Sequence, residues 1–419
     1  MNIPFGFTPG DSNSDDPNSN NEQKFDMNSL GAMLQQLGSM MQQSETDGET
    51  GSVSWNTIRD TARNAISQSG DPSITEGQQK SVNDAVALAQ TWVDAVTTFP
   101  ANSSKALAWS RSEWLVQTLP AWQPLIDPVA DGLQNTMADM NSDLLPGMEV
   151  PPELKQMLEP VMAMAKKMAA ISTGMQLGNG LGTLSNEMIA ASDIAAPLSA
   201  NCIPAILPNA VSRFAEEHEL PVSEAMVYIA VREVAFQRLM AANSWLQREL
   251  ADLISAFARG IEFDSDRIRE IMSSVDPADA NGVQELMASG IFEPTTSESQ
   301  KKALNKMEFT LALVEGWVSL VTAAAVADRL ANASALNETF LRRQISGGPA
   351  SKTFAKLVGL ELRPRMLRDT QELWNLIDSR LGMEKRDWIW SHPDFCPSAD
   401  DLQDPEKYLE TLKNSEASD

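Results

Sequence analysis

The stretch that decides the fold is Ala230-Val231-Arg232-Glu233-Val234-Ala235-Phe236-Gln237-Arg238-Leu239. Apolar residues recur around it at steps of three and four, which predicts one long amphipathic helix from about Pro221 to about Ala258. The positions that carry this apolar stripe are Val222, Met226, Ile229, Phe236 and Met240. Glu233 fills the stripe position between Ile229 and Phe236. A carboxylate facing a core is costly unless it is paired or used in chemistry, so Glu233 is a candidate site residue.

A second acid stands in a similar place further along the chain. Glu315 is the only charged residue in the apolar run 309–327. That run is nearly as long as a membrane span, which needs about 20 apolar residues. The central charge and the many alanines favour a buried helix instead. The sequence therefore predicts two helices that each present one acid where a core residue belongs.

Length and charge limit the class of protein. The chain has 419 residues, of which 42% are hydrophobic, enough for two to three domains or one large helical assembly. Residues 1–50 carry eight acids and one lysine, and residues 394–419 carry eight acids and two lysines, about half of the net charge of −25. This acidity argues against nucleic acid or an anionic membrane as a partner. The first residues lack a basic segment followed by an apolar one, so we expect no signal peptide and a cytoplasmic location.

Cysteine and histidine are scarce. The chain has two cysteines, Cys202 and Cys396, too few for a disulfide framework, and neither belongs to a CxxC motif. It also has two histidines, His218 and His392. Because histidine is the commonest zinc ligand, this count restricts metal chemistry severely.

Apolar periodicity predicts a mainly α protein with little or no β-sheet. We divide the chain into a disordered acidic segment 1–50, a helical region 51–200, a helical core 201–346, C-terminal helices 347–393 and an acidic tail 394–419. Before the core we expect a short helix at 28–43 and longer ones at 55–69, 75–98, 110–119, 123–140 and 152–173. From the core onward we expect further helices at 265–274, 279–289, 300–330, 335–344, 350–358 and 364–381.

Proline and glycine punctuate this pattern. We expect Pro120 to interrupt a helix, and the glycine-rich stretch 174–182 to be a loop, either a flexible turn or a site of close helix packing. Gly178-Asn-Gly-Leu-Gly lacks the Gly-Lys-Ser/Thr ending of a phosphate-binding loop. If the chain has a strand, we expect it near 196–207, and the segment 388–397 should be a loop.

Several short stretches together resemble one known family. They include Ile3-Pro-Phe-Gly-Phe, Ala89-Gln-Thr-Trp-Val-Asp, Arg111-Ser-Glu-Trp, Thr118-Leu-Pro-Ala-Trp, Arg232-Glu-Val-Ala-Phe-Gln-Arg-Leu, Phe257-Ala-Arg-Gly, Leu313-Val-Glu-Gly-Trp-Val, Phe354-Ala-Lys-Leu-Val-Gly-Leu-Glu-Leu-Arg-Pro and His392-Pro-Asp. In this order they are similar to an actinobacterial family of predicted zinc-dependent metalloproteases, also described as hydrolases. The resemblance covers nearly everything from Trp55 to Pro405 and implies a mostly helical, zincin-like, intracellular protein.

The chemistry of that family carries over only in part. A zincin places two histidines at positions i and i+4 of a helix, with a glutamate after the first one as general base. A later acid, in a Glu-Gly pair that resembles Glu315-Gly316, completes the ligand set. The resemblance puts Arg232 and Phe236 at the two histidine positions, Glu233 at the base position and Glu315 at the later ligand position. Arginine has no lone pair for Zn²⁺ and phenylalanine has no donor atom, so one acid is left where a catalytic zinc needs three protein ligands.

The two histidines do not obviously replace the missing ligands. His218 lies 15 residues before Glu233, or about 22 Å along a continuous helix. His392 precedes a proline in a C-terminal loop, where a structural role in a turn accounts for it.

Three hypotheses follow. In the first, zinc catalysis is lost, no cofactor is bound, and Arg232 and Phe236 belong to a site that binds a peptide or protein partner, with Arg232 supplying the positive charge between Glu233 and Glu315. In the second, the chain is an active zinc-dependent metalloprotease with an unrecognised ligand set. In the third, the two acids bridge helices through arginines, the candidates being Arg232, Arg238, Arg342 and Arg343.

Overall fold

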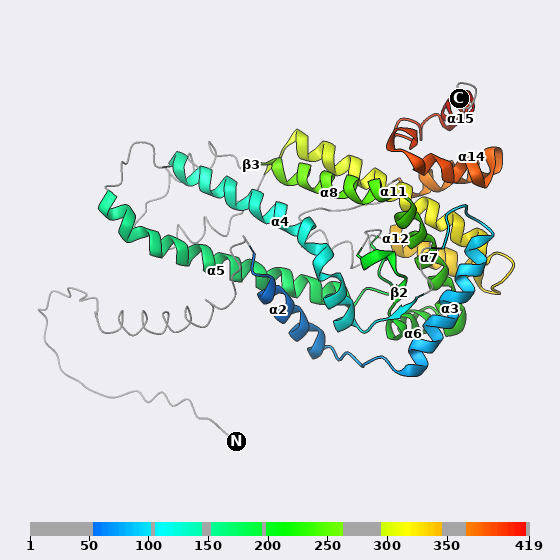
Figure 1. Ribbon diagram of the computed structural model, residues 1–419, viewed down its shortest axis with the longest axis horizontal. Helices are drawn as coiled ribbons and strands as arrows, with labels where there is room; N and C mark the ends of the chain where they lie inside the picture. The colour runs from blue at the N-terminus through cyan, green and yellow to red at the C-terminus, as the bar shows by residue number, and fades with distance from the viewer. Residues whose placement is uncertain are drawn as a thin grey trace, which may run out of the picture. The chain divides into compact units, whose positions relative to one another are not determined.

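The computed structural model describes residues 53–101, 105–144, 152–194, 198–262, 295–345 and 366–415 (Figure 1). The acidic segment 1–50 and the predicted helices 28–43, 265–274, 279–289 and 350–358 lie outside the described residues. The main helices are α2 (Trp55–Gln68), α3 (Glu76–Asp94), α4 (Arg111–Leu144), α5 (Pro152–Ser185), α6 (Pro208–Glu217), α7 (Val222–Ala242), α8 (Ser244–Arg259), α11 (Glu298–Val326), α12 (Ala333–Ile345), α14 (Leu367–Trp388) and α15 (Pro405–Ser415). The mainly α fold class is confirmed.

Strands are short in the described part of the chain. The strands β1 (Leu107–Ala108) and β2 (Ala205–Ile206) pair in parallel, with Leu107 opposite Ala205. The strands β3 (Ile261–Glu262) and β4 (Thr295–Thr296) pair antiparallel. The single strand expected near 196–207 corresponds to β2, and the other three strands were not predicted.

Helix α7 is the centre of the larger apolar cluster. It packs against α3, α6 and α11, and all of its residues from Tyr228 to Met240 are buried. A helix that contacts neighbours on every side is buried all round, so its polar residues Arg232, Glu233, Gln237 and Arg238 are buried together with its apolar ones. Any charged residue in this span, Glu233 included, must therefore find its partners inside the protein.

Helix α11 carries the second acid. It packs against α7, α8 and α14. Among the described helices it is the one long and apolar enough to cross a membrane by length and composition, and 72% of its most apolar window is buried inside the fold. A core helix meets the same test, and its packing agrees with the buried helix expected for 300–330.

The single helix predicted from Pro221 to Ala258 is wrong. The chain leaves helical geometry at Asn243, where φ is −126° and ψ is 70°, and α8 begins at Ser244. The Asn243 side chain donates to the carbonyl oxygen of Leu239 at 2.9 Å. An asparagine side chain that bonds a backbone carbonyl of the preceding turn competes with helix continuation, which is a local reason for the break.

Two predicted interruptions are also wrong. Helix α4 continues through Pro120, Pro124 and Pro128, although each proline removes a backbone donor. It buries Trp114 and Trp122, and this packing offsets the local cost. Helix α5 likewise continues through the glycine-rich stretch to Ser185.

The glycines of α5 allow close helix packing, one of the two roles considered for them. Gly174, Gly178 and Gly182 are four residues apart and face α2. A Cβ on Gly178 would lie 2.7 Å from the carbonyl oxygen of Ile58, so only glycine fits there. At the other end of the chain, the segment expected to be a loop contains the 3₁₀ turns Ile389–Ser391 and Pro393–Phe395.

Candidate functional site

Glu233 lies on α7 and its carboxylate is enclosed by hydrogen-bond donors. Ser192 donates to Oε2 from its backbone N–H at 3.1 Å and from its hydroxyl. Oε1 accepts from the backbone N–H of Ala205 at 3.2 Å and from the Gln237 side chain at 2.9 Å. The residue is 0% exposed. Glu233 therefore ties α7 to the segment that contains Ser192 and β2.

Burial and hydrogen bonding act in opposite directions on this acid. Burial disfavours the charged form and is the larger effect, whereas the donors of Ser192, Gln237 and Ala205 favour it. The net result raises the pKa of Glu233 from 4.5 to about 6. The carboxyl thus has a pKa in the range of a general acid or base, although its oxygens are occupied by structural donors.

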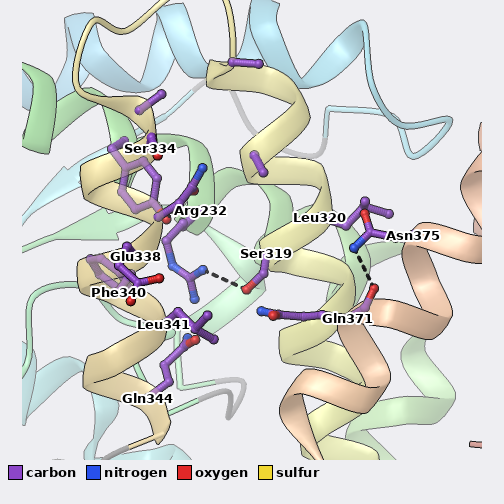
Figure 2. A pocket seen from close by; sticks show the side chains of 15 residues that line it. Arg232, Ser319, Leu320, Ser334, Glu338, Phe340, Leu341, Gln344, Gln371 and Asn375 are labelled. Atoms are coloured by element: carbon purple, nitrogen blue, oxygen red, sulfur yellow. Dashed lines mark hydrogen bonds between the residues drawn. The ribbon is translucent and has the colours of Figure 1, made fainter.

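Arg232 and Glu315 meet between α7 and α11. The Arg232 guanidinium forms an ion pair and hydrogen bond with Oε1 of Glu315, and both side chains are about nine-tenths buried. The Gln344 side chain, from α12, donates to the same oxygen. Nη1 of Arg232 donates a long hydrogen bond of 3.4 Å to the Ser319 hydroxyl. Figure 2 marks this contact with a dashed line. The structure thus brings together two of the residues singled out from the sequence.

An aromatic ring continues this cluster. The Phe340 ring lies 4.7 Å from the Arg232 guanidinium carbon and 5.6 Å from that of Arg343. Arg343 in turn pairs with Asp193 at 2.9 Å. Asp193 follows Ser192, so the surroundings of Glu233 and of Glu315 are connected through α12. Cation–π contacts of this kind are worth about 0.5–2 kcal/mol, depending on desolvation.

The arrangement differs from the one expected for Arg232. We expected its charge to lie between both acids, but its ion pair is with Glu315, and the donors around Glu233 come from Ser192, Ala205 and Gln237. The other three candidate arginines pair elsewhere: Arg238 with Asp94, Arg342 with Glu338 and Arg343 with Asp193. Phe236 is 1% exposed and belongs to the apolar cluster around α7.

The residues at these positions do not fit a zinc ion. Arg232 and Phe236 offer no ligand atom, and Oε1 of Glu315 already accepts from Arg232 and Gln344. Within the described residues no group of three or more His, Cys, Asp or Glu side chains could hold a metal.

The two histidines lie elsewhere in the structure. His218 follows α6, and its ring packs against Phe214 at 4.8 Å between centroids. His392 is exposed, and its Nδ1 accepts from the backbone N–H of Asp394 at 3.2 Å. It lines a cavity of about 820 Å³ whose walls include neither Glu233 nor Glu315.

A cavity of about 570 Å³ opens beside Arg232 (Figure 2). Its walls come from α7, α11, α12 and α14. Polar lining residues are Tyr228, Arg232, Ser319, Ser334, Asn337, Glu338, Gln344, Gln371 and Asn375. Tyr228 donates to Asn337 at 2.9 Å, and burial raises the pKa of Tyr228 to about 12, so its hydroxyl stays protonated at neutral pH. The volume is typical of a small-molecule or peptide pocket.

Most of the hydrogen-bond and ring partners of Glu233, Arg232 and Glu315 were not predicted from the sequence. Gln237 and Ser319 are each four residues after an acid on the same helix, so helical spacing was a signal that could have identified them. Ser192, Phe340 and Gln344 are far from the acids in sequence, and no local pattern marks them.

The comparisons with known proteins agree with the helical fold. Residues 53–409 match the family of zincin-like metallopeptidases. The chain belongs to this family. The narrower actinobacterial assignment stays a prediction.

The comparison with solved structures adds one similar fold. The crystal structure of a "putative hydrolase with a novel fold" from Chloroflexus aurantiacus has a TM-score of 0.59 and 15% identity, and the match covers 86% of this chain and 99% of that one. At this identity the likeness concerns the fold alone. The comparison with curated proteins finds no match.

Proposed function

We propose that this member of the zincin-like metallopeptidase family has lost zinc-dependent hydrolysis and uses the cavity beside Arg232 to bind a peptide or protein partner. The observation that carries the proposal is the ion pair between Arg232 and Glu315. These are the positions at which the resemblance to zincins expects a metal ligand from each helix. A guanidinium paired with the remaining acid supplies the positive charge that a metal would otherwise supply.

The alternative is an active zinc-dependent metalloprotease with another ligand set, and membership of the family favours it. Zinc analysis of the purified full chain separates the two. We expect well below one zinc per chain, even after dialysis against zinc. Stoichiometric zinc that disappears in Glu315→Ala would overturn the proposal.

A second variant tests whether the ligand positions are the right ones. Arg232→His combined with Phe236→His places two imidazoles four residues apart on one face of α7, with Glu233 next to the first. It also releases the Glu315 carboxylate from its ion pair. We expect this double variant to bind about one zinc per chain, and Arg232→His alone to bind zinc more weakly. A folded double variant that stays free of zinc would show that these are not the metal positions.

A further inference from the structure

Each strand of the small parallel sheet leads directly into a helix. Trp109 and Ser110 separate β1 from α4, and Leu207 alone separates β2 from α6. Because the two strands pair in parallel, the N-termini of both helices lie at the same edge of the sheet. The carboxyl edge of parallel strands is a common place for ligands to bind. A cavity of about 230 Å³ lies at this edge, and it shares no lining residue with the cavity beside Arg232.

The N-terminus of α4 already binds a carboxylate. Asp71 accepts from the backbone N–H of Arg111 at 3.1 Å and from that of Ser112 at 2.9 Å. The free N–H groups and the positive end of the helix dipole favour an anion at such a position. The N-terminus of α6 lacks this partner. Leu207 precedes it without a capping side chain, and the backbone N–H of Asn209 has no acceptor among the described residues.

Two side chains in the wall of the cavity are more than nine-tenths buried and each has a hydrogen to donate. Trp109 is 6% exposed and Ser110 is 7% exposed. The indole Nε1 of Trp109 donates to none of the described residues, and it is not sealed from solvent as Nε1 of Trp114 is. The Ser110 hydroxyl accepts from the backbone N–H of Glu113 at 3.2 Å, which leaves its own proton for a ligand. A carboxylate, which only accepts hydrogen bonds, suits both groups.

The charges of the cavity wall favour a ligand with one negative charge. Among the described lining residues the charged ones are Asp71, Arg111 and Arg213. Burial raises the pKa of Asp71, but hydrogen bonds from Ser112 and Arg111 outweigh this effect and hold that pKa below its ordinary value, so Asp71 is charged at neutral pH. It forms an ion pair of 3.6 Å with Arg111, which leaves one positive charge, that of Arg213.

Arg213 is available to a ligand. Its side chain is exposed and pairs with no carboxylate in the part of the chain that the structure describes. One of its nitrogens donates to the carbonyl oxygen of Asn186 at 3.0 Å, and the others remain for a second acceptor. It lies four residues after Asn209 on α6, so the guanidinium and the N-terminus of that helix are on the same side.

We propose that this cavity binds a small monocarboxylate with a short aliphatic tail. The carboxylate accepts from Trp109, Ser110 and the backbone N–H of Asn209, and Arg213 supplies the counter-charge. The tail lies against the apolar part of the wall, which consists of Pro72, Leu207 and Ala210. The site is separate from the cavity beside Arg232, so it does not depend on the proposed loss of zinc catalysis.

Three small probes test the proposal on the full chain at pH 8. Propionate carries one negative charge, propionamide is its neutral counterpart, and inorganic phosphate is mostly doubly charged. The indole N–H resonances of the ten tryptophans are followed by ¹H–¹⁵N NMR, and the one lost in Trp109→Phe belongs to Trp109. We expect propionate to move this resonance saturably, with a dissociation constant on the order of 1 mM. Propionamide and phosphate should bind at least about tenfold more weakly.

A variant of Arg213 tests the counter-charge. Arg213→Gln removes the unpaired positive charge of the wall, so propionate should bind at least about tenfold more weakly. Arg259 is also exposed but does not line the cavity, so Arg259→Gln is the matched control and should bind normally. Calorimetry with these two surface variants gives the comparison even if Trp109→Phe does not fold.

Equal binding of propionate and propionamide, tighter binding of phosphate, or no saturable binding of propionate would overturn the proposal. Propionate binding that is unchanged in Arg213→Gln would place the ligand elsewhere and overturn it as well. None of these outcomes involves zinc content. A chain that ignores propionate therefore contradicts this site alone, whereas stoichiometric zinc contradicts the proposed loss of catalysis alone.

Discussion

At the scale of single residues, Arg232 and Glu233 are neighbours on α7 but have different partners. Arg232 binds Glu315 on α11, and Glu233 binds donors from the segment around Ser192 and β2. Successive residues of a helix point about 100° apart, so one helix can place two opposite charges in two separate polar environments. The site is thus two adjoining clusters, joined through Asp193 and α12.

The ion pair of Glu315 should matter for stability. Glu315→Gln leaves the buried Arg232 guanidinium without a counter-ion, so we expect the free energy of unfolding to fall by about 3–5 kcal/mol. Urea unfolding followed by circular dichroism measures the change. Glu338→Gln is the control, since it breaks an exposed ion pair and should cost less than about 1 kcal/mol. An unchanged unfolding midpoint in Glu315→Gln would contradict a bridging role.

Glu233 should make stability depend on pH. Its pKa in the folded chain is about 6, above the ordinary 4.5, so the folded state favours the neutral acid. This preference contributes about 2 kcal/mol to the free energy of unfolding. The contribution is fully present below about pH 4.5 and is lost as the pH rises through about 6. Comparing wild type with Glu233→Gln at each pH cancels the other titrating groups. Between pH 4.5 and 7, the unfolding free energy of the wild type should fall by about 2 kcal/mol relative to that of Glu233→Gln. A difference that stays constant over this pH range would contradict a raised pKa of Glu233.

At the scale of elements, apolar periodicity predicted most of the described helices. Predictions based on proline and glycine as helix breakers put several helix boundaries in the wrong place. Pro120 and the α5 glycines were expected to end helices, yet both helices continue. Intrinsic propensity is a weak influence that packing overrides, as it does where α5 lies close to α2. At Asn243 a local interaction overrides the pattern instead. Helix α7 ends there although the apolar periodicity of the sequence continues into α8.

The close packing of α2 on α5 is directly testable. In Gly178→Ala the new Cβ would meet the backbone oxygen of Ile58, so we expect a loss of about 1–3 kcal/mol in unfolding free energy. Gly77 is also helical, but its nearest neighbour would be 3.9 Å away. Gly77→Ala should therefore be neutral or stabilising by up to about 1 kcal/mol. Thermal unfolding of the two variants gives the comparison, and an equal effect in both would refute a packing role for Gly178.

At the scale of the whole molecule, long-range contacts join parts that the sequence suggested dividing. Asp387 of α14 accepts hydrogen bonds from Thr97, Thr98 and Trp317, and so connects the chain after α3 with α11. The apolar cluster around α7 includes residues from Val82 to Leu412. The boundaries at 200, 346 and 393 stay predictions, and the described helices on both sides of each boundary contribute to this one cluster.

The sequence by itself determined the helical class, the two acids on core-facing stripes and the absence of ligand atoms at Arg232 and Phe236. These features depend on residue type and on the local period of a helix. Only the tertiary structure decided which donors surround each acid, because the pairs Arg232–Glu315 and Ser192–Glu233 span 83 and 41 residues. Such pairs depend on how helices pack, and the desolvation that makes them strong exists only once the helices enclose them.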